Sequence, residues 1–273
     1  TLAVGKWHLG AHESLRPLNR GFDEFFGFLT GGHQYFPEQW NLADETEVKC
    51  NFCAYRTKLL RNEKRIDEKD YLTDALSRET VSFIERSSNS PFFIYLAYNA
   101  PHGPLQATEK YLKRYSHIKD KRRKTYAAMV SSIDDGVGDI VSALKEKNIY
   151  NNTIIYFLSD NGGAKSNASN NAPLNSHKGT LYEGGIRIPF VMQWPDEIKG
   201  GTIFTKPIIS LDIFATSKAI INPDLELKNK IHGKDLLPFI KGFDNGYPHE
   251  YLYWRNNGHQ PYIENGVRAR YIT

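Results

Sequence analysis

Apolar positions follow a helical period in two long segments of the chain. Between residues 70 and 86 they return every three or four positions, and Pro91 follows soon after. Residues 124–147 show the same spacing, although Gly136 and Gly138 weaken the helix interior. The pattern predicts two amphipathic helices that pack against a core.

Continuous apolar runs alternate with these helical segments. Residues 92–97 and 153–158 are typical of strands buried on both faces, and residues 188–195 predict a further strand. Strand, helix and strand in this order imply a right-handed crossover and a parallel sheet. The shorter apolar runs at 251–254 and 266–271 predict a small C-terminal antiparallel sheet. The fold class is therefore expected to be α/β.

The composition limits the size of the hydrophobic core and the kinds of partner that the chain can bind. The chain has 273 residues, of which 40% are hydrophobic and 13% aromatic, enough for one large domain with a smaller appendage. We place the large domain at residues 1–215 and a smaller C-terminal subdomain at 216–273. No apolar run reaches the roughly 20 residues that a membrane span needs, so no membrane partner is expected.

The net charge is +4, and much of the excess lies in residues 119–124. That segment lacks interleaved aromatic residues, so it indicates the solvated start of a helix rather than a nucleic-acid site. A mildly basic surface still attracts anionic polysaccharides. Cys50 and Cys53 form a CxxC pair without a second pair. A structural zinc site is therefore disfavoured, which leaves a local disulfide and two free thiols as alternatives.

Polar residues follow the apolar run that ends at Leu158. Asp160 and Asn161 offer the hard oxygen ligands that Ca²⁺ or Mg²⁺ prefers, at the strand end where α/β sheets collect ligands. Gly162 and Gly163 allow the backbone to approach a bound group closely. The same residues are typical of an ordinary turn, and this alternative stays open.

Three further loops hold a His or a Lys between glycines or prolines. They are Gly5-Lys6-Trp7-His8-Leu9-Gly10, Ala100-Pro101-His102-Gly103-Pro104 and the segment His177 to Arg187, HKGTLYEGGIR. Loops that follow apolar runs are able to direct these side chains at one point beside a metal. Their common target would be an anion. Taken singly, each has a plainer explanation, a solvated Lys or a His that caps a turn.

The four motifs GKWHLG, PHGP, SDNGG and HKGTLYEGGIR, in this order, resemble those of the type I sulfatases of the alkaline phosphatase superfamily. The segment from Asn19 to Gly27, NRGFDEFFG, is similar to the one that follows GKWHLG in these enzymes. The middle of the chain resembles the arylsulfatase B-like branch, which acts on sulfated sugars. The resemblance implies an alkaline phosphatase-like mixed, mostly parallel sheet flanked by helices, with a small C-terminal antiparallel sheet.

The resemblance also implies roles for individual residues. Asp160 and Asn161 would be metal ligands for Ca²⁺, with Mg²⁺ as the alternative. Lys6 and Lys178 would contact the oxygens of the sulfate group. Both lysines are thereby candidates for catalysis and for substrate binding.

Two histidines carry implied catalytic roles. His8 would lie beside the formylglycine nucleophile of the family, and His102 would contact the substrate as a general acid, since an imidazole titrates near working pH. His33 stands where the family places part of its sugar pocket, and an ordinary surface loop is the alternative there.

One departure from the family pattern concerns the nucleophile. Family members carry paired metal-binding aspartates and a Cys-x-Pro/Ser-x-Arg motif, whose Cys becomes formylglycine, before GKWHLG. Neither precedes Gly5 here, and neither Cys50 nor Cys53 begins such a motif. We expect that the chain lacks about the first hundred residues of a sulfatase, with the N-terminal strand or strands. Alone, it is expected to show no sulfatase turnover and weak metal affinity.

These observations predict a sulfuric ester hydrolase that removes sulfate from a sulfated carbohydrate, such as a glycosaminoglycan or algal polysaccharide fragment. The resemblance implies a location outside the cytoplasm, whether periplasmic, secreted or lysosomal. A non-catalytic sulfatase-like binding protein would also lack the nucleophile. A phosphatase or phosphodiesterase of the same superfamily is disfavoured, because its second-metal histidines are not evident. The oligomeric state is left open.

Overall fold

The computed structural model describes residues 1–256 and 266–271, which form two compact units. The first unit comprises residues 1–150 and 165–170, and the second comprises 151–164 and the described part of 171–273. Residues 165–170 are held in the first unit by hydrogen bonds such as Arg123 Nη1 to the Ala168 carbonyl, 3.0 Å. The predicted boundary at residue 215 falls within a helix of the second unit and stays a prediction.

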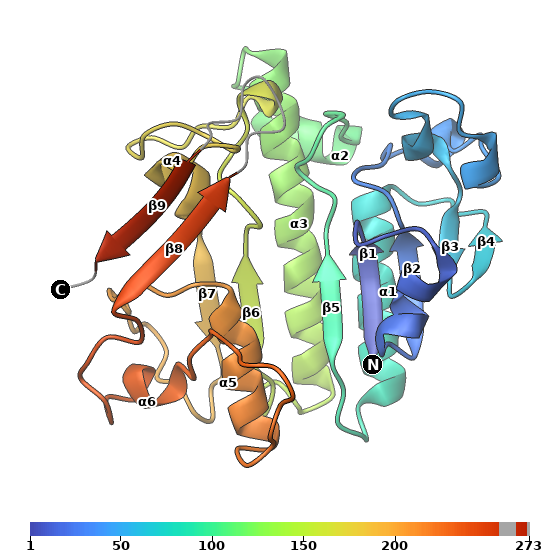
Figure 1. Cartoon of the computed structure of the whole chain (residues 1–273). Coiled ribbons are helices and arrows are strands. Elements are labelled where there is room, and N and C mark those ends of the chain that lie inside the picture. Colours follow the sequence, from blue (N-terminus) through green and yellow to red (C-terminus); the bar gives the residue numbers. More distant parts are fainter. Residues whose placement is uncertain (257–265, 272–273) are drawn as a thin grey trace. The chain divides into compact units, whose positions relative to one another are not determined.

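The first unit is built on a five-stranded sheet with the order β4-β3-β2-β1-β5 (Figure 1). The strands are β1 (Leu2–Lys6), β2 (Glu24–Phe28), β3 (Leu59–Arg61), β4 (Lys64–Ile66) and β5 (Ile94–Ala97). β1 pairs parallel with both β2 and β5, whereas β3 pairs antiparallel with β2 and with β4. The predicted mixed sheet is therefore confirmed, although its parallel and antiparallel pairs are equal in number rather than mostly parallel.

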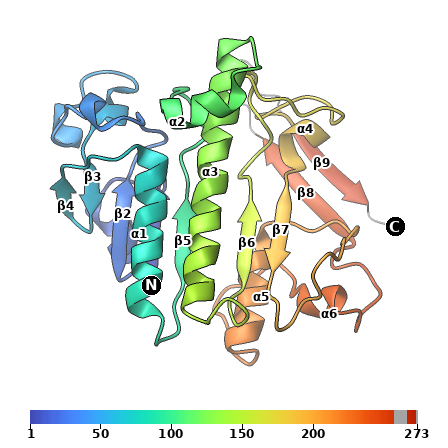
Figure 2. The same cartoon turned by 180° about the vertical axis from the view of Figure 1, so that it is seen from behind.

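Three helices belong to this unit: α1 (Leu72–Ser87), α2 (Glu109–Leu112) and α3 (Lys121–Glu146). α1 lies against the sheet face seen in Figure 2, and α3 packs along α1. The long helices confirm the two segments predicted from helical spacing. The short 3₁₀ helices of the chain span Glu13–Leu15, Pro17–Arg20, Pro37–Gln39, Glu45–Glu47, Cys53–Arg56, Lys113–Tyr115 and Lys165–Asn167.

Both faces of the sheet are buried around β1. Leu2 and Val4 point into a core shared with Leu76 of α1 and Met129 of α3. Ala3 points to the opposite face, into a second cluster that includes Trp7. The alternation follows from the period of two in a strand. This double burial holds the carboxyl end of β1, and the residues that follow it, in a fixed position.

α3 lies close against α1 at Gly136. A Cβ there would lie 2.1 Å from Ser77 Oγ and 2.6 Å from the hydroxyl of Tyr98, which form a hydrogen bond of 2.7 Å with each other. Gly138, two residues on, is exposed and has no atom within 4 Å of such a Cβ. Helix packing therefore requires a glycine at residue 136. It does not require one at residue 138.

Substitution by alanine should separate these two glycines. Gly138→Ala is expected to raise the free energy of unfolding by up to about 1 kcal/mol, which is a few degrees in Tm, because alanine is the better helix former. Gly136→Ala should lower the free energy of unfolding by about 1–3 kcal/mol, because the added methyl overpacks the contact between the helices. Thermal unfolding of both variants checks this, and equal shifts in Tm would contradict it.

The described residues of the second unit form two strand pairs and three helices. β6 (Ile155–Leu158) pairs antiparallel with β7 (Phe190–Gln193), and β8 (Tyr251–Asn256) pairs antiparallel with β9 (Gly266–Tyr271). The helices are α4 (Glu183–Ile186), α5 (Leu211–Ile221) and α6 (Leu237–Ile240). The small C-terminal antiparallel sheet and the existence of strands near 155 and 190 are confirmed. The predicted crossover from β5 through α3 to a parallel β6 is wrong, because β6 pairs antiparallel with β7 in a separate sheet. Within the described residues β6 pairs with β7 alone.

A buried carboxylate joins distant parts of the second unit. Asp212 in the first turn of α5 accepts hydrogen bonds from the backbone amides of Ile209 (2.9 Å) and Lys234 (2.8 Å). Its Oδ1 also lies 2.8 Å from Nε2 of His249. Asp212 is fully buried, so these partners replace the water that a carboxylate otherwise requires. Among the helices that the structure describes, none is both long and apolar enough to cross a membrane.

Candidate functional site

The carboxyl edge of the five-stranded sheet carries two of the predicted loops. β1 and β5 are parallel neighbours, with Gly5 opposite Ala97, so the residues that follow each strand leave the sheet at the same edge. Lys6 is the last residue of β1, and His8 follows it in an extension bonded to the carbonyl of Leu29. His102 lies in the loop after β5. The structure thus places Lys6, His8 and His102 at one edge of one sheet.

His8 occupies an unusual backbone conformation. Its φ is 56°, in the left-handed region that few residues other than glycine adopt, and its side chain is exposed. Gly31 lies directly against the imidazole, because a Cβ on Gly31 would be only 2.5 Å from Nε2 of His8. The neighbouring Trp7 is buried and donates from Nε1 to the carbonyl of Leu15 at 2.8 Å. The strained residue is therefore held by packing on both sides.

His102 is fixed by hydrogen bonds to its ring and its backbone. Nδ1 lies 2.7 Å from the carbonyl oxygen of Gly103, and since a carbonyl only accepts, Nδ1 carries a proton. The carbonyl of His102 accepts from the hydroxyl of Tyr35 at 2.8 Å. Asn99 donates from Nδ2 to the carbonyl of His33 at 3.0 Å. These bonds join the loop after β5 to the 30–35 loop and direct Nε2 of His102 away from the anchoring carbonyl.

The predicted substrate contact of His33 is not supported by its position. The side chain is fully buried, Nδ1 lies 2.8 Å from the carbonyl oxygen of Gln34, and Nε2 lies 2.8 Å from that of Thr57. The ring also packs on Phe28 and Trp40. Because no part of the ring reaches the surface, His33 stabilises its loop from the protein interior. The alternative of an ordinary surface loop is equally wrong for this residue.

Burial lowers the pKa of His33 to about 4, against the opposing effect of the Gln34 and Thr57 carbonyls. The unfolded chain, in which the pKa is about 6.5, then binds more protons than the folded chain between pH 6.5 and 4. The free energy of unfolding is therefore expected to fall as pH falls through this window, because the cost of burying the charged ring exceeds the gain from its two carbonyl partners. Urea unfolding across the window measures the slope.

Two variants assign this slope to one residue. His33→Gln should be less stable at neutral pH and should lose most of the dependence between pH 6.5 and 4. His117→Gln, which changes an exposed histidine of the same unit, should keep it. An unchanged slope in His33→Gln would show that other groups produce the acid sensitivity.

The second unit brings the remaining predicted residues together. Asp160 and Asn161 follow the end of β6, as expected. The amide of Lys178 donates to the carbonyl of Gly163 at 3.1 Å, and the amide of Gly162 donates to the carbonyl of Gly185 at 3.0 Å. The SDNGG loop and the loop that carries Lys178 are therefore joined backbone to backbone.

The oxygen donors at this position are few. Asp160 is exposed and Asn161 half-buried, so both side chains are accessible to a cation, but Asn161 also donates from Nδ2 to the carbonyl of Gly162 at 3.0 Å. In residues 1–256 and 266–271, no cluster of three or more His, Cys, Asp or Glu side chains is arranged to hold a metal ion. Ca²⁺ takes six to eight oxygens. These two residues thus fit as part of a coordination shell.

The predicted site residues are divided between the units. Lys6, His8 and His102 belong to the first unit, and Asp160, Asn161 and Lys178 belong to the second. Their convergence on one oxyanion stays a prediction. Sequence reasoning did not assign a role to Gly31. The signal for Gly31 was the Gly-Gly pair itself, because adjacent glycines are typical of close backbone approach.

The open question about the cysteines is settled by a disulfide between Cys50 and Cys53, with the Cα atoms 5.3 Å apart. It closes a loop just before the 3₁₀ helix Cys53–Arg56. The disulfide alternative is therefore confirmed, and neither sulfur is a free thiol.

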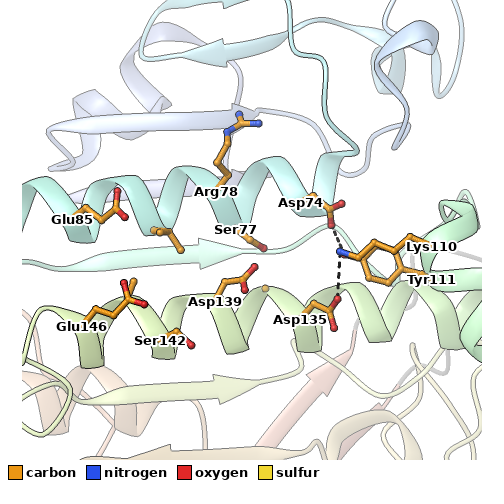
Figure 3. Close-up of a pocket in the computed structure, with 13 residues that line it drawn as sticks. Asp74, Ser77, Arg78, Glu85, Lys110, Tyr111, Asp135, Asp139, Ser142 and Glu146 are labelled. Carbon is orange, nitrogen blue, oxygen red and sulfur yellow. Dashed lines mark hydrogen bonds and ion pairs between the residues drawn. The ribbon is translucent and has the colours of Figure 1, made fainter.

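A groove of about 460 Å³ runs between α1 and α3 (Figure 3). Its lining contains none of the predicted site residues. Asp74 accepts a hydrogen bond from the hydroxyl of Tyr111 at 2.7 Å, and Asp135 pairs with Arg114 at 2.6 Å and with Lys110 at 3.5 Å. Burial raises the pKa of Asp74. These ion pairs and hydrogen bonds connect α1 and α3 with the segment that contains α2. The groove is therefore explained as a polar interface between packed helices.

Comparisons with known proteins agree with the motifs. The sulfatase family model matches residues 1–221. Arylsulfatase J of Mus musculus is 33% identical over 244 residues, which cover 86% of this chain and 39% of that protein. N-acetylgalactosamine-6-sulfatase of Mus musculus is 34% identical over 268 residues, which cover 93% of this chain and 48% of that protein. The chain thus spans less than half the length of these two relatives.

A solved structure extends the similarity over the whole chain. Ps i-CgsB, crystallised in complex with k-i-k-neocarrahexaose, matches with a TM-score of 0.90 and 42% sequence identity, covering 100% of this chain and 61% of that chain. The fold is accordingly the alkaline phosphatase-like fold of these enzymes. With the family model matching residues 1–221 and the loops that carry Lys6, His8 and His102 at the edge of one sheet, the chain belongs to the sulfatase family.

Proposed function

We propose that the protein carrying this chain is a sulfuric ester hydrolase that removes sulfate from a sulfated carbohydrate. The observation that carries the proposal is the placement of Lys6, His8 and His102 at the carboxyl edge of one sheet, in a chain of the sulfatase family. The 42% identity with Ps i-CgsB, which binds k-i-k-neocarrahexaose, favours a sulfated algal oligosaccharide over a simple aryl ester.

In this proposal the lysines stabilise negative charge and the histidines transfer protons. Lys6 and Lys178 bind the non-bridging oxygens of the sulfate, where fixed cations stabilise the charge that builds up in the transition state. His102 donates a proton from Nε2 to the leaving alkoxide, since its Nδ1 is committed to the carbonyl of Gly103. His8, held by Gly31, exchanges protons beside the nucleophile.

Two groups outside this chain's own side chains complete the proposed chemistry. Asp160 and Asn161 would hold part of the shell of a Ca²⁺ or Mg²⁺ ion, which would supply Lewis-acid stabilisation of the sulfate charge. A formylglycine from a Cys-x-Pro/Ser-x-Arg motif, which this sequence does not contain, supplies the nucleophile. The 273-residue chain alone is accordingly proposed to be inactive.

We also propose a location outside the cytoplasm. The disulfide between Cys50 and Cys53 supports it, because disulfides persist in the periplasm, in secreted proteins and in other oxidising compartments.

The proposal is tested by expressing the complete gene and measuring sulfate release. The expected result is hydrolysis of sulfated oligosaccharides with a higher kcat/KM than that of p-nitrophenyl sulfate. Turnover of aryl sulfate alone would contradict the carbohydrate substrate. Binding of sulfated oligosaccharides without any sulfate release would identify a non-catalytic relative, and turnover of phosphate esters alone would identify a phosphatase.

A further inference from the structure

The disulfide presents two aromatic side chains in the first unit. Cys50 and Cys53 close the turn that contains Phe52, whose φ of 66° lies in the left-handed region. The Phe52 side chain is 73% exposed, and its ring contacts that of Tyr55 with 5.4 Å between the centroids. A phenylalanine in this conformation is strained and solvated, so the disulfide holds it in a position that folding alone does not favour.

The aromatic pair lies close to His8. A Cβ on Gly32 would be 2.6 Å from the ring of Tyr55, just as a Cβ on Gly31 would be 2.5 Å from the ring of His8. The two adjacent glycines are therefore in contact with an imidazole and a phenol ring, respectively. The amide of Gln34 donates to the carbonyl of Tyr55 at 2.9 Å and keeps the two loops together. The rings of Tyr55 and His8 thus contact adjacent residues, Gly32 and Gly31, of one loop.

A polar hollow adjoins the same segment. It has a volume of about 330 Å³ and is lined by Gln34, Glu38, Gln39, Asn41 and Arg56. Arg56 follows Tyr55 in the sequence and donates from Nε to Oδ1 of Asn41 at 3.0 Å. Amide side chains suit sugar hydroxyls, and a guanidinium binds the oxygens of a sulfate or carboxylate with charge-assisted hydrogen bonds.

The hollow is also tied to the His102 loop. Gln39 accepts from Nε2 of Gln106 at 2.8 Å, and the side chain of Gln106 accepts from the amide of Tyr35, whose hydroxyl donates to the carbonyl of His102. These hydrogen bonds therefore join the hollow, through Gln39, to the loop that carries His102.

We propose that Phe52, Tyr55 and Arg56 form a binding subsite for a second, anionic sugar unit of the substrate, next to the unit that loses its sulfate. The aromatic pair would stack on the apolar face of that sugar, and Arg56 would bind its sulfate or carboxylate. This proposal rests on the proposed function and adds that the substrate is an oligosaccharide with charge beyond the cleaved group.

The test compares two substrates in the product of the complete gene. For Phe52→Ala and for Arg56→Gln, kcat/KM for k-i-k-neocarrahexaose is expected to fall at least about tenfold further than kcat/KM for p-nitrophenyl sulfate. The matched control is Phe243→Ala, which removes another exposed phenylalanine ring (83%) from the second unit. Phe243→Ala should change neither value. Equal losses for both substrates, or none, would overturn the subsite.

A binding measurement separates failure of the subsite from failure of the proposed function. Calorimetric titration with neocarrahexaose should give a Kd at least about tenfold weaker in Phe52→Ala and Arg56→Gln than in the wild type. If the wild type binds the hexasaccharide but releases no sulfate, the proposed function fails and this difference in Kd still decides the subsite. If both variants bind as tightly as the wild type, the subsite is wrong whatever the turnover.

Discussion

Replacing Asp160 with alanine is expected to lower kcat/KM of the complete gene product by about 10³-fold, because a catalytic metal supplies several kcal/mol of transition-state stabilisation. Asp160 is the charged member of the two oxygen donors that follow β6, and it is exposed to solvent. Its removal leaves Asn161, a neutral amide that already donates a hydrogen bond to the carbonyl of Gly162. The metal would then lose its only anionic ligand from this loop.

The dependence of activity on metal concentration identifies the cause. If Asp160 acts as a ligand, raising Ca²⁺ or Mg²⁺ should restore part of the activity of Asp160→Ala, and the apparent metal affinity should fall. The matched control is Asp196→Ala, which removes an exposed carboxylate from a turn after β7 in the same unit and should behave as the wild type. A loss of activity that no metal concentration changes would argue against a ligand role.

Local sequence patterns were sufficient for the longer elements of this fold. The apolar period located α1 and α3, and continuous apolar runs located β5, β6 and β7. The ends were less accurate: β5 begins at Ile94, although the run begins at Phe92. Strand ends are set by pairing with β1, which comes from a distant part of the sequence. The three-residue strands β3 and β4 are too short to show a period, so no pattern predicted them.

His33 shows why residue type alone misplaces a site. A polar stretch with two glycines is typical of the surface, yet this histidine is buried because the carbonyl of Thr57, 24 residues further on, satisfies its Nε2. A hydrogen bond between residues so far apart in the sequence cannot be inferred from the local pattern of polar and apolar residues. By contrast, Lys6, His8 and His102 lie at one edge of the sheet, as expected for residues at or after the carboxyl ends of two parallel neighbouring strands, and their roles stay a prediction.

The SDNGG loop (residues 159–163) and the loop that carries Lys178 pack so closely that there is no room for a side chain at Gly162. Gly162 is buried, and a Cβ there would lie 1.8 Å from the carbonyl oxygen of Gly184 and 3.0 Å from Cα of Gly185. Every one of these neighbours is backbone, so a side-chain rotation cannot relieve the clash. The amide of Gly162 also donates to the carbonyl of Gly185 at 3.0 Å, and that bond would break when the loops separate.

Gly162→Ala is therefore expected to lower kcat/KM of the complete gene product by about 10²-fold, because a displacement on the order of 1 Å is enough to misalign Asp160 and Lys178. The free energy of unfolding should fall by only about 1–3 kcal/mol, the usual cost of overpacking. Gly200→Ala in the same unit is the control, since its Cβ would meet no atom within 4 Å. Enzyme kinetics and thermal unfolding, measured together, separate misalignment from global unfolding. If Gly162→Ala kept kcat/KM within about threefold of the wild type, the close approach of these loops would have no part in catalysis.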